Sequence, residues 1–349
     1  MNAIRSRRGE RDMETILVRT KNSAATEFYY DIIADALHQC SELIFDGFDE
    51  NAIPKGHKNA VVVAGSCVSM MRLWMKGYRN IVTWYQGVLP EESFIRNRSR
   101  ARMLVLGFIE KFALRHSALQ IFVSDAMREF YEEKYGLELT NCYTMPCFNT
   151  QYNAQLVAGK CFDGRVFTYT GGLSKWQCID QTLALYKRIE EASGNTTKLL
   201  LLTPALDKAR ELVTQYGICN AEIKSVHYSQ LPEALKEASF GFALREDNPV
   251  NRVATPTKFA NYVANGVIPV YTSCVRDFLK ASEGNPYQIV LQDVNAITDE
   301  DVRRIMEMAD NMPDAREVSP YFGAYFEAYY NPHRHARQLA HMIGKIDTL

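Results

Sequence analysis

Short apolar runs alternate with helical stretches along almost the whole chain, and this alternation restricts its possible folds more than any other feature. In the first half, the runs lie at 16–20, 59–64, 81–84 and 119–124, and the predicted helices lie near 23–40, 70–76, 92–116 and 126–135. Continuously apolar strands joined by helices are typical of a parallel sheet with both faces covered. The first half is therefore predicted to form an α/β lobe.

A second series of the same kind follows. Its strands are predicted at 166–171, 198–204, 221–227, 240–246, 267–273 and 287–292, with helices near 177–191, 207–216, 230–238, 256–264 and 299–308. Six strands with short helical crossovers make a complete Rossmann-like lobe. The fold class is thus α/β, with two Rossmann-like lobes facing a central cleft.

A chain of 349 residues is longer than one hydrophobic core usually serves, which agrees with two lobes. The predicted parts are a flexible basic leader (1–13), an N-terminal lobe (14–150), an interlobe linker (151–164), a C-terminal lobe (165–320) and a C-terminal helix (321–349). Because the last helix follows a finished sheet, we expect it to pack back on the N-terminal lobe.

Charge and cysteine usage limit the location and the partners. A formal net charge of −1 provides no global field for nucleic acid, so an anionic ligand requires a local site. Eight cysteines without a C-x-x-C pair, and no cleavable signal, indicate reduced thiols in the cytoplasm. No apolar run reaches the roughly 20 residues that a membrane span requires. The four arginines of the leader fit either a mobile segment or contact with anionic lipid.

The segment Asn251–Phe259 is the strongest local signal. It follows a predicted strand, and it offers Thr255 as helix N-cap, Pro256 as first helical residue and, later, Gly266 as C-cap. Backbone N–H groups at Thr257 and Lys258 would then face the carboxyl ends of the strands. There they and the helix dipole stabilise an anion such as a diphosphate. Arg245 and Arg252 add positive charge nearby. The alternative is an ordinary capped crossover helix with solvated charges.

A strand that runs into Gly171-Gly172 is the second signal. Glycines without Cβ let a ligand approach the backbone, and Lys175 follows where it can reach a phosphate. The alternative is a tight bend without a ligand.

Three segments together resemble glycosyltransferase family 4, of the two-lobed GT-B type: TGGLSKW, REDNPVNRVATPTKFANYVANGVIPV and IFVSDAMREFYEEKYG. The resemblance covers about 82–270. It implies retaining transfer of a sugar from a nucleotide-diphosphate sugar bound in the C-terminal lobe to an acceptor in the N-terminal lobe. It also implies that no metal ion or other cofactor is needed, since lysine, arginine and the helix dipole neutralise the diphosphate.

The resemblance places the donor beside Gly171 and Gly172, above the helix start at 255–258, with Lys175 close to the family's phosphate-binding lysine. The donor-binding residues that it predicts here are Gly171, Gly172, Arg245, Asn251, Thr255, Pro256, Thr257 and Asn261. The predicted catalytic residues are Lys175, Arg252, Lys258 and Glu246. The predicted acceptor-binding residues are Gln86, Gly87 and Ser66, with Gln86 where many relatives carry histidine.

The chain departs from the family at a pair of glutamates, which Val253 and Asn261 replace. Asn261 can hydrogen-bond a hydroxyl but holds no full negative charge, and Glu246 is the candidate for the missing carboxylate. Because of this departure, a non-catalytic nucleotide-sugar-binding subunit stays an alternative, as does a sugar-nucleotide epimerase. A dehydrogenase is disfavoured by the absence of G-x-G-x-x-G after a first strand.

Two further segments complete the predictions. The Asp299–Asp301 segment has the D-x-D form of a metal site, but it follows Thr298 at a helix start, which indicates capping, and no metal site is predicted. Arg96, Arg98, Arg100 and Arg102 precede the apolar stretch 103–114. That pattern fits either a buried core helix with a solvated basic end or docking on the inner face of an anionic membrane. The expected partners are a nucleotide sugar and a glycan or lipid-linked acceptor, and no nucleic acid.

Overall fold

The computed structural model describes residues 13–20 and 24–346, apart from the side chains of Ala24, Ala25 and Lys175. The chain divides into two compact units, Met1–Met145 with Pro332–Leu349, and Pro146–Asn331. Nearly all of the predicted basic leader lies outside the described residues. The segment 151–164 belongs to the second unit, because its short helix packs on a later helix of that unit.

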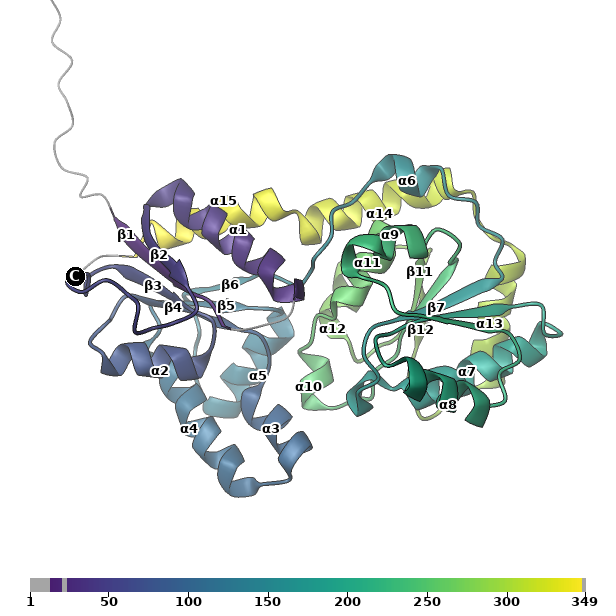
Figure 1. The fold of residues 1–349 in the computed structure, drawn as a ribbon, viewed down its shortest axis with the longest axis horizontal. Coiled ribbons are helices and arrows are strands. Elements are labelled where there is room, and N and C mark those ends of the chain that lie inside the picture. The colour runs from purple at the N-terminus through teal and green to yellow at the C-terminus, as the bar shows by residue number, and fades with distance from the viewer. Residues whose placement is uncertain (1–12, 21–23, 347–349) are drawn as a thin grey trace, which may run out of the picture. The chain divides into compact units, whose positions relative to one another are not determined.

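The first unit is built on a six-stranded parallel sheet (Figure 1). Its strands are β1 (Glu14–Val18), β2 (Glu42–Gly47), β3 (Val61–Ala64), β4 (Ile81–Tyr85), β5 (Leu119–Phe122) and β6 (Cys142–Thr144), in the order β2-β1-β3-β4-β5-β6. Every residue of β3, β4 and β5 is buried, as expected for central strands covered on both faces. The predicted parallel sheet is thus confirmed.

The helices of the first unit come from both ends of the chain. They are α1 (Ala24–Cys40), α2 (Cys67–Met75), α3 (Leu89–Asn97), α4 (Arg100–His116), α5 (Asp125–Tyr135) and α15 (Pro332–Ile343). Helix α15 lies along α1, and its buried His335 approaches Tyr143, with 2.7 Å between Nδ1 and the phenol oxygen. The C-terminal helix therefore returns to the N-terminal lobe, as the fold prediction requires (Figure 1).

The second unit repeats the architecture. Its parallel strands are β7 (Val166–Thr170), β8 (Lys198–Leu202), β9 (Ala221–Lys224), β10 (Phe240–Ala243), β11 (Ile268–Thr272) and β12 (Ile289–Leu291), in the order β12-β11-β10-β7-β8-β9. Its helices are α6 (Ala154–Ala158), α7 (Ile179–Ala192), α8 (Leu206–Gln215), α9 (Leu231–Ala234), α10 (Pro249–Arg252), α11 (Thr257–Ala264), α12 (Arg276–Ala281), α13 (Asp299–Asp310) and α14 (Ala315–Tyr330). This strand order is that of a Rossmann fold, with its switch point between β7 and β10.

Several elements differ from the predictions for identifiable reasons. Strands β2 and β6 were not predicted, because each is an edge strand without the run of buried apolar residues on which the prediction relied. The predicted helix 92–116 is two helices, since Arg98 adopts a left-handed conformation (φ 53°) and the Ser99 hydroxyl caps α4. The predicted C-terminal helix also divides, at Asn331 before Pro332.

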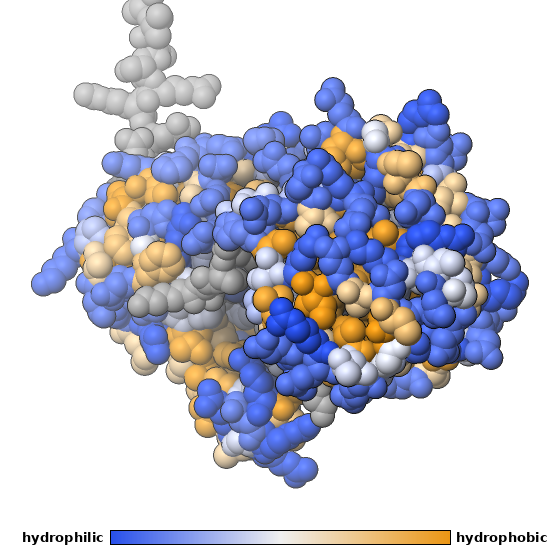
Figure 2. Space-filling view, turned by 45° about the vertical axis from the view of Figure 1, so that its right-hand side comes forward, coloured by the Kyte–Doolittle hydropathy of each residue, from blue (hydrophilic) through white to orange (hydrophobic). Residues whose placement is uncertain are grey.

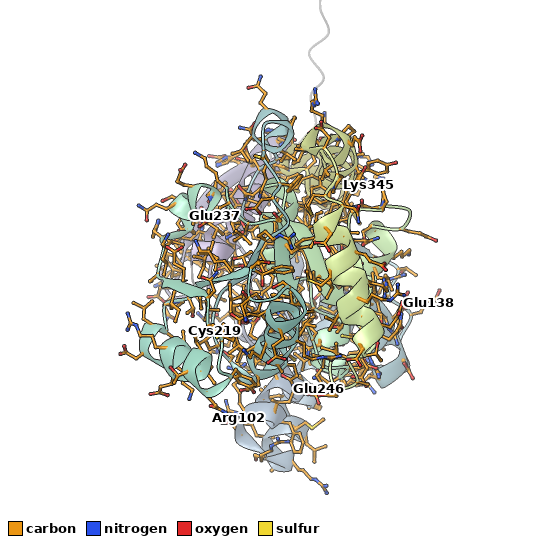
Figure 3. All side chains as sticks on the ribbon, turned by 90° about the vertical axis from the view of Figure 1, so that its right-hand side faces the viewer. Arg102, Glu138, Cys219, Glu237, Glu246 and Lys345 are labelled. Atoms are coloured by element: carbon orange, nitrogen blue, oxygen red, sulfur yellow. The ribbon has the colours of Figure 1, made fainter. Side chains whose placement is uncertain are left out.

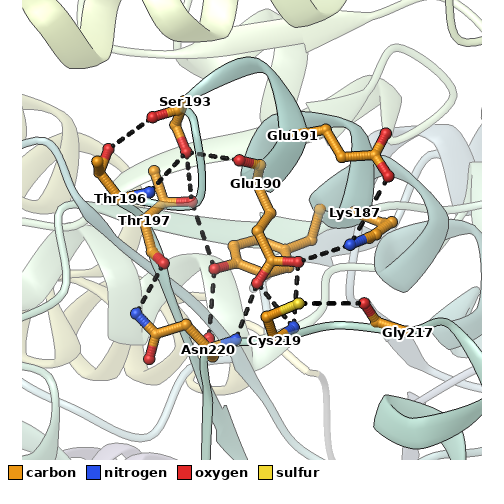
Figure 4. A network of polar contacts seen from close by, with 10 residues as sticks. Lys187, Glu190, Glu191, Ser193, Thr196, Thr197, Gly217, Cys219 and Asn220 are labelled. Atoms are coloured by element: carbon orange, nitrogen blue, oxygen red, sulfur yellow. Dashed lines mark hydrogen bonds and ion pairs between the residues drawn. The ribbon is translucent and has the colours of Figure 1, made fainter.

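A buried carboxylate, Glu190, stabilises the second unit (Figure 4). Glu190 on α7 accepts hydrogen bonds from the backbone N–H groups of Cys219 (2.9 Å) and Asn220 (2.9 Å), and Lys187 lies 3.0 Å away. Burial raises the pKa of Glu190, but these backbone bonds and Lys187 outweigh it and lower the pKa overall. The network ties α7 to the turn that leads into β9.

Candidate functional site

A cavity of about 360 Å³ opens in the second unit at the carboxyl ends of β7, β8 and β10. This is the switch point of the sheet, where doubly wound α/β folds bind their ligands. The described residues that line it are Thr170, Gly171, Gly172, Gln177, Leu202, Thr203, Pro204, Val226, Tyr228, Leu231, Arg245, Pro256, Thr257, Lys258 and Asn261. The two signals found in the sequence, the glycine pair and the start of α11, therefore meet in one cavity.

The start of α11 lines this cavity with Pro256, Thr257 and Lys258. Pro256 is the N-cap, and Thr257 and Lys258 form the first turn, where N–H groups have no partner within the helix. The prediction of Thr255 as N-cap was wrong. Its hydroxyl instead accepts a hydrogen bond from the Cys147 N–H at 3.0 Å. The C-cap is Asn265 and not the predicted Gly266, which follows it in a left-handed conformation with φ 65°.

Lys258 is the most unusual residue of the cavity. Its side chain is buried, and its Nζ atom has no hydrogen-bond partner among the described residues. It lies 4.0 Å from the centre of the Tyr169 ring. Burial lowers the pKa of Lys258 well below its ordinary value, and the positive charge of Arg245 lowers it further. A buried ammonium group without a counter-ion is costly, so this position favours an anionic ligand.

Arg245 is the second buried cation of the cavity. It is 3% exposed, and its guanidinium group donates to the Gln177 side-chain oxygen at 2.8 Å and to the Leu244 carbonyl oxygen at 2.8 Å. Both partners are neutral. Burial lowers the pKa of Arg245 as well. Among the described residues that line the cavity, the charged ones are Arg245 and Lys258, so the lining has a net positive charge of two when both are protonated.

Gly171 and Gly172 leave room for a ligand at the end of β7. Gly171 has φ 117°, a conformation that other residues rarely adopt, and a Cβ atom at either glycine would meet no atom within 4 Å. The glycine pair therefore opens the backbone to the cavity, and its role beside a diphosphate stays a prediction.

Other predicted donor-site and catalytic residues lie elsewhere. Arg252 is paired with Asp247 (2.5 Å and 2.9 Å) and does not line the cavity. Glu246 is exposed and also lies outside the lining (Figure 3). Asn251 is buried, with its side-chain amide donating to the Glu246 carbonyl oxygen. The side chain of Lys175 is outside the described part of the structure.

The two positions at which the glutamate pair is absent differ in location. Asn261 lines the cavity, and its amide donates to the Asn149 side-chain oxygen and the Thr257 carbonyl oxygen, each at 3.1 Å. Val253 is buried and does not line it. The described lining therefore contains no carboxylate.

Sequence reasoning missed part of this lining. Gln177, which orients Arg245, belongs to a short 3-10 helix, and Thr203 and Val226 follow the ends of β8 and β9. The position of the latter two just after predicted strands was a usable signal, because the carboxyl ends of parallel strands share one edge. Tyr228, which is 52% exposed, has no such mark in the sequence.

The first unit has a cavity of its own, of about 370 Å³, at the carboxyl ends of β1, β3 and β4. The described residues that line it are Thr20, Gly65, Ser66, Cys67, Trp84, Tyr85, Gln86, Gly87, Leu89 and Glu92. The three predicted acceptor-binding residues, Ser66, Gln86 and Gly87, are thus together. The Gln86 amide donates to the Gly65 carbonyl oxygen at 2.9 Å, and the Ser66 hydroxyl caps α2.

Solved structures share this architecture. The chain matches sucrose-phosphate synthase from Thermosynechococcus elongatus with TM-score 0.68 and 14% identity, over 94% of this chain and 98% of that one. The fold is that of the GT-B glycosyltransferases. The chain also matches WaaG, a glycosyltransferase involved in lipopolysaccharide biosynthesis, with TM-score 0.59 and 10% identity, over 94% of this chain and 99% of that one. A third match is TarM from S. aureus in complex with fondaparinux, α-GlcNAc-glycerol and UDP. Its TM-score is 0.63 and its identity 12%, over 93% of this chain and 59% of that one.

These matches confirm the predicted GT-B fold and leave the narrower resemblance to family 4 as a prediction. The chain spans about three fifths of the TarM chain. No family model and no curated protein sequence matches the chain.

The metal prediction concerned the segment Asp299–Asp301. Thr298 caps α13, and the Asp301 carboxylate accepts a hydrogen bond from the Thr298 N–H at 2.9 Å, which makes a complete capping box. Within residues 13–20 and 24–346, no group of three or more His, Cys, Asp or Glu side chains is placed to hold a metal ion. Independence of a metal ion stays a prediction.

Proposed function

We propose that the protein transfers a sugar from a nucleotide-diphosphate sugar, bound in the cavity of the second unit, to a glycan or lipid-linked acceptor. The observation that carries the proposal is the pair of buried cations, Lys258 and Arg245, at the start of α11 and beside an open glycine turn. Two positive charges without a described carboxylate between them match the charge of a diphosphate. The TarM structure with UDP has the same fold, which supports a nucleoside diphosphate as the ligand.

In the proposed reaction, the bond between the sugar and the diphosphate breaks, and negative charge grows on the departing phosphate. Lys258, Arg245 and the N–H groups of the first turn of α11 would stabilise that charge without the help of a metal ion. Because these groups are fixed by burial and by Gln177, they need little reorganisation during the reaction. Retention of configuration belongs to this proposal and rests on the resemblance to family 4.

The predicted catalytic residues are not equally supported by the structure. Lys258 lies in the cavity, whereas Arg252 and Glu246 do not line it. Of the predicted donor-binding residues, Gly171, Gly172, Arg245, Pro256, Thr257 and Asn261 line the cavity. Asn261 would bind a hydroxyl group of the sugar or ribose, because its amide oxygen is an acceptor.

Thermal-shift measurements with UDP, GDP, CDP and ADP sugars, followed by transfer assays with the donors that bind, test the proposal. A bound donor raises the melting temperature by mass action, and transfer to an added glycan identifies an enzyme. If no nucleotide stabilises the protein at millimolar concentration, the proposed donor site is wrong. Binding without transfer or hydrolysis would instead identify a nucleotide-sugar-binding subunit, which the lack of a described carboxylate in the lining favours as the second candidate.

We also propose that the α3–α4 region docks on an anionic membrane. Leu104, Val105 and Phe108 on α4 are 75%, 61% and 67% exposed, which excludes the alternative of a fully buried core helix. Arg96, Arg98, Arg100 and Arg102 precede them, and all four are exposed. Exposed apolar side chains next to a basic cluster fit the interface of an anionic bilayer.

The figures agree with this arrangement. Helices α3 and α4 project at the lower end of the first unit in Figure 1, and Arg102 projects there in Figure 3. In Figure 2, hydrophilic and hydrophobic residues lie side by side at this lower end. Among the described residues, each helix is too short or too polar to span a membrane.

A further inference from the structure

The cavity of the first unit contains one charged residue among its described lining residues, the carboxylate of Glu92. Glu92 lies on α3, and its Oε2 atom is 3.1 Å from the Arg96 guanidinium group. Burial raises the pKa of Glu92, and the charge of Arg96 opposes this shift. The Glu92 side chain is 31% exposed, so it is reachable from the cavity without being freely solvated.

Gly87 makes room for this carboxylate. A Cβ atom at Gly87 would lie only 1.9 Å from Glu92 Oε1, so any larger residue there would displace the carboxylate. The glycine does not need a left-handed backbone, because its φ lies outside that region. Glycine at this position therefore leaves the Glu92 carboxylate where it is, beside the backbone.

Trp84 provides a hydrogen-bond donor in the same lining. Its Nε1 atom is buried and has no hydrogen-bond partner within the described residues. Two neighbouring rings fix its position. The Trp84 ring stacks on the Tyr29 ring, with 4.0 Å between the ring centroids, and meets the Tyr30 ring edge-on, with 5.1 Å between the centroids. An indole N–H is only a donor, and a carboxylate is only an acceptor.

We propose that this cavity binds an uncharged, hydroxyl-rich group, a sugar without a phosphate, through Glu92 and Trp84. A hydroxyl group both donates and accepts, so sugar hydroxyls satisfy the carboxylate and the indole N–H together. A fully ionised phosphate group only accepts hydrogen bonds, so it cannot donate to the Glu92 carboxylate as a sugar hydroxyl does. The inference rests on the proposed function, since it names the class of acceptor that receives the sugar. Glu92 is then a specificity-determining residue of the acceptor cavity.

Ligand-observed NMR on the full-length protein tests the inference without a donor. The probes are methyl α-glucoside, methyl β-galactoside and N-acetylglucosamine on one side, and glucose 6-phosphate and fructose 6-phosphate on the other. We expect binding of at least one neutral sugar at least about 10-fold tighter than binding of either phosphate, because one hydrogen bond to a charged group contributes that much. Equal or tighter binding of the phosphates would overturn the inference, and so would no binding of any neutral sugar at millimolar concentration.

Two variants test the residue itself. Glu92→Gln keeps the size of the side chain and should weaken binding of the neutral sugar about 10-fold or more, and Gly87→Ala should do the same by displacing an intact carboxylate. Glu129→Gln, an exposed residue of α5, is the matched control and should change nothing. Unaltered melting temperatures establish that the variants fold. Full sugar affinity in both folded variants would remove Glu92 from the site.

The donor site is measured separately in the same samples. The UDP-induced shift of the melting temperature should be equal in wild type, Glu92→Gln and Gly87→Ala, because these residues belong to the first unit. A protein that binds neutral sugars through Glu92 but no nucleotide would contradict the proposed function and leave this sugar site intact. A protein that binds UDP but prefers sugar phosphates would contradict this inference alone.

Discussion

Lys258 Nζ lies 4.0 Å from the centre of the Tyr169 ring, in the cavity that Arg245 also lines. A cation over an aromatic face is stabilised by roughly 0.5–2 kcal/mol, less than full burial of an unpaired ammonium group costs. The missing stabilisation is what a diphosphate would provide. The protonation of Lys258 should therefore change when a diphosphate binds.

We predict that Lys258→Met lowers turnover about 100-fold without destabilising the protein. The substitution removes a charge that burial disfavours and keeps the aliphatic chain against Tyr169, so the melting temperature without ligand should stay equal or rise. Kinetics with the preferred donor and thermal unfolding measure the two effects. Lys236→Met, at an exposed lysine, is the control. Near wild-type turnover in Lys258→Met would remove Lys258 from the site.

The lowered pKa of Lys258 also predicts proton uptake when UDP binds. A dianion beside Lys258 raises the pKa of the amine, so the complex holds more protons than the free protein at the same pH. Calorimetry in buffers with different ionisation enthalpies measures this uptake. It should disappear in Lys258→Met, and equal uptake in both proteins would assign the proton to another group.

The sequence predicted the sheets and the position of this cavity well, because both depend on local patterns. Buried strands such as β8 are continuous apolar runs, and a proline at the start of α11 marked the helix whose first turn lines the cavity. The glycine pair after β7 was visible for the same reason.

The partners of charged side chains could not be predicted from such patterns. Arg252 is five residues from Asp247 in the sequence, yet nothing in that spacing says that the two form an ion pair rather than face a ligand. Thr255 likewise binds the Cys147 N–H, 108 residues away. Glu92 was not recognised because its proximity to Gly87 depends on how α3 leaves the sheet. These contacts depend on the tertiary structure, so no periodic pattern in the sequence predicts them.

Glu190 gives a stability prediction in the acid range. Glu190→Gln should lower the free energy of unfolding by about 3 kcal/mol at pH 7, because it removes the charge that the N–H groups of Cys219 and Asn220 and the Lys187 amine stabilise. The pKa of Glu190 is lowered in the folded protein. Its contribution is therefore complete above the pKa of the unfolded chain, about 4.3, and is lost as pH falls through the folded pKa.

Denaturant unfolding of wild type and Glu190→Gln from pH 7 to pH 3 measures this difference. The gap between the two proteins should shrink as the pH falls below about 4. Glu191→Gln, an exposed neighbour that lies 3.6 Å from the same Lys187, should cost at most about 0.5 kcal/mol. A constant gap across the acid range would show that the charge of Glu190 is not the source of its effect.

Lys160 gives a prediction in the alkaline range. Burial lowers the pKa of Lys160 to about 7, and its Nζ donates to the carbonyl oxygens of Leu235 (3.0 Å) and Asn265 (2.9 Å). Between about pH 7 and the ordinary lysine pKa of about 10.4, the unfolded chain holds a proton that the folded protein lacks. Lys160 therefore makes the folded protein more stable as pH rises through this window, by at most about 1.4 kcal/mol per pH unit.

Denaturant unfolding of wild type and Lys160→Met from pH 6.5 to pH 10.5 isolates this contribution, since other titrating groups cancel in the difference. The free energy of unfolding of wild type should rise relative to that of the variant across the window. A difference that does not change with pH would contradict a lowered pKa at Lys160.

Binding to anionic vesicles tests the proposed role of α3 and α4. Replacing Leu104 and Phe108 with Ser should reduce cosedimentation with vesicles about 10-fold or more, because each large apolar side chain contributes roughly 1.5–3 kcal/mol when it leaves water. Replacing Arg100 and Arg102 with Gln should weaken binding to anionic vesicles only, by roughly 1 kcal/mol for each charge. Tyr321→Ser removes an exposed aromatic side chain of the second unit and serves as the control.

Equal binding of wild type to neutral and anionic vesicles would refute the electrostatic part of the proposal. Full binding by the Leu104 and Phe108 variant would show that α4 is not the docking element.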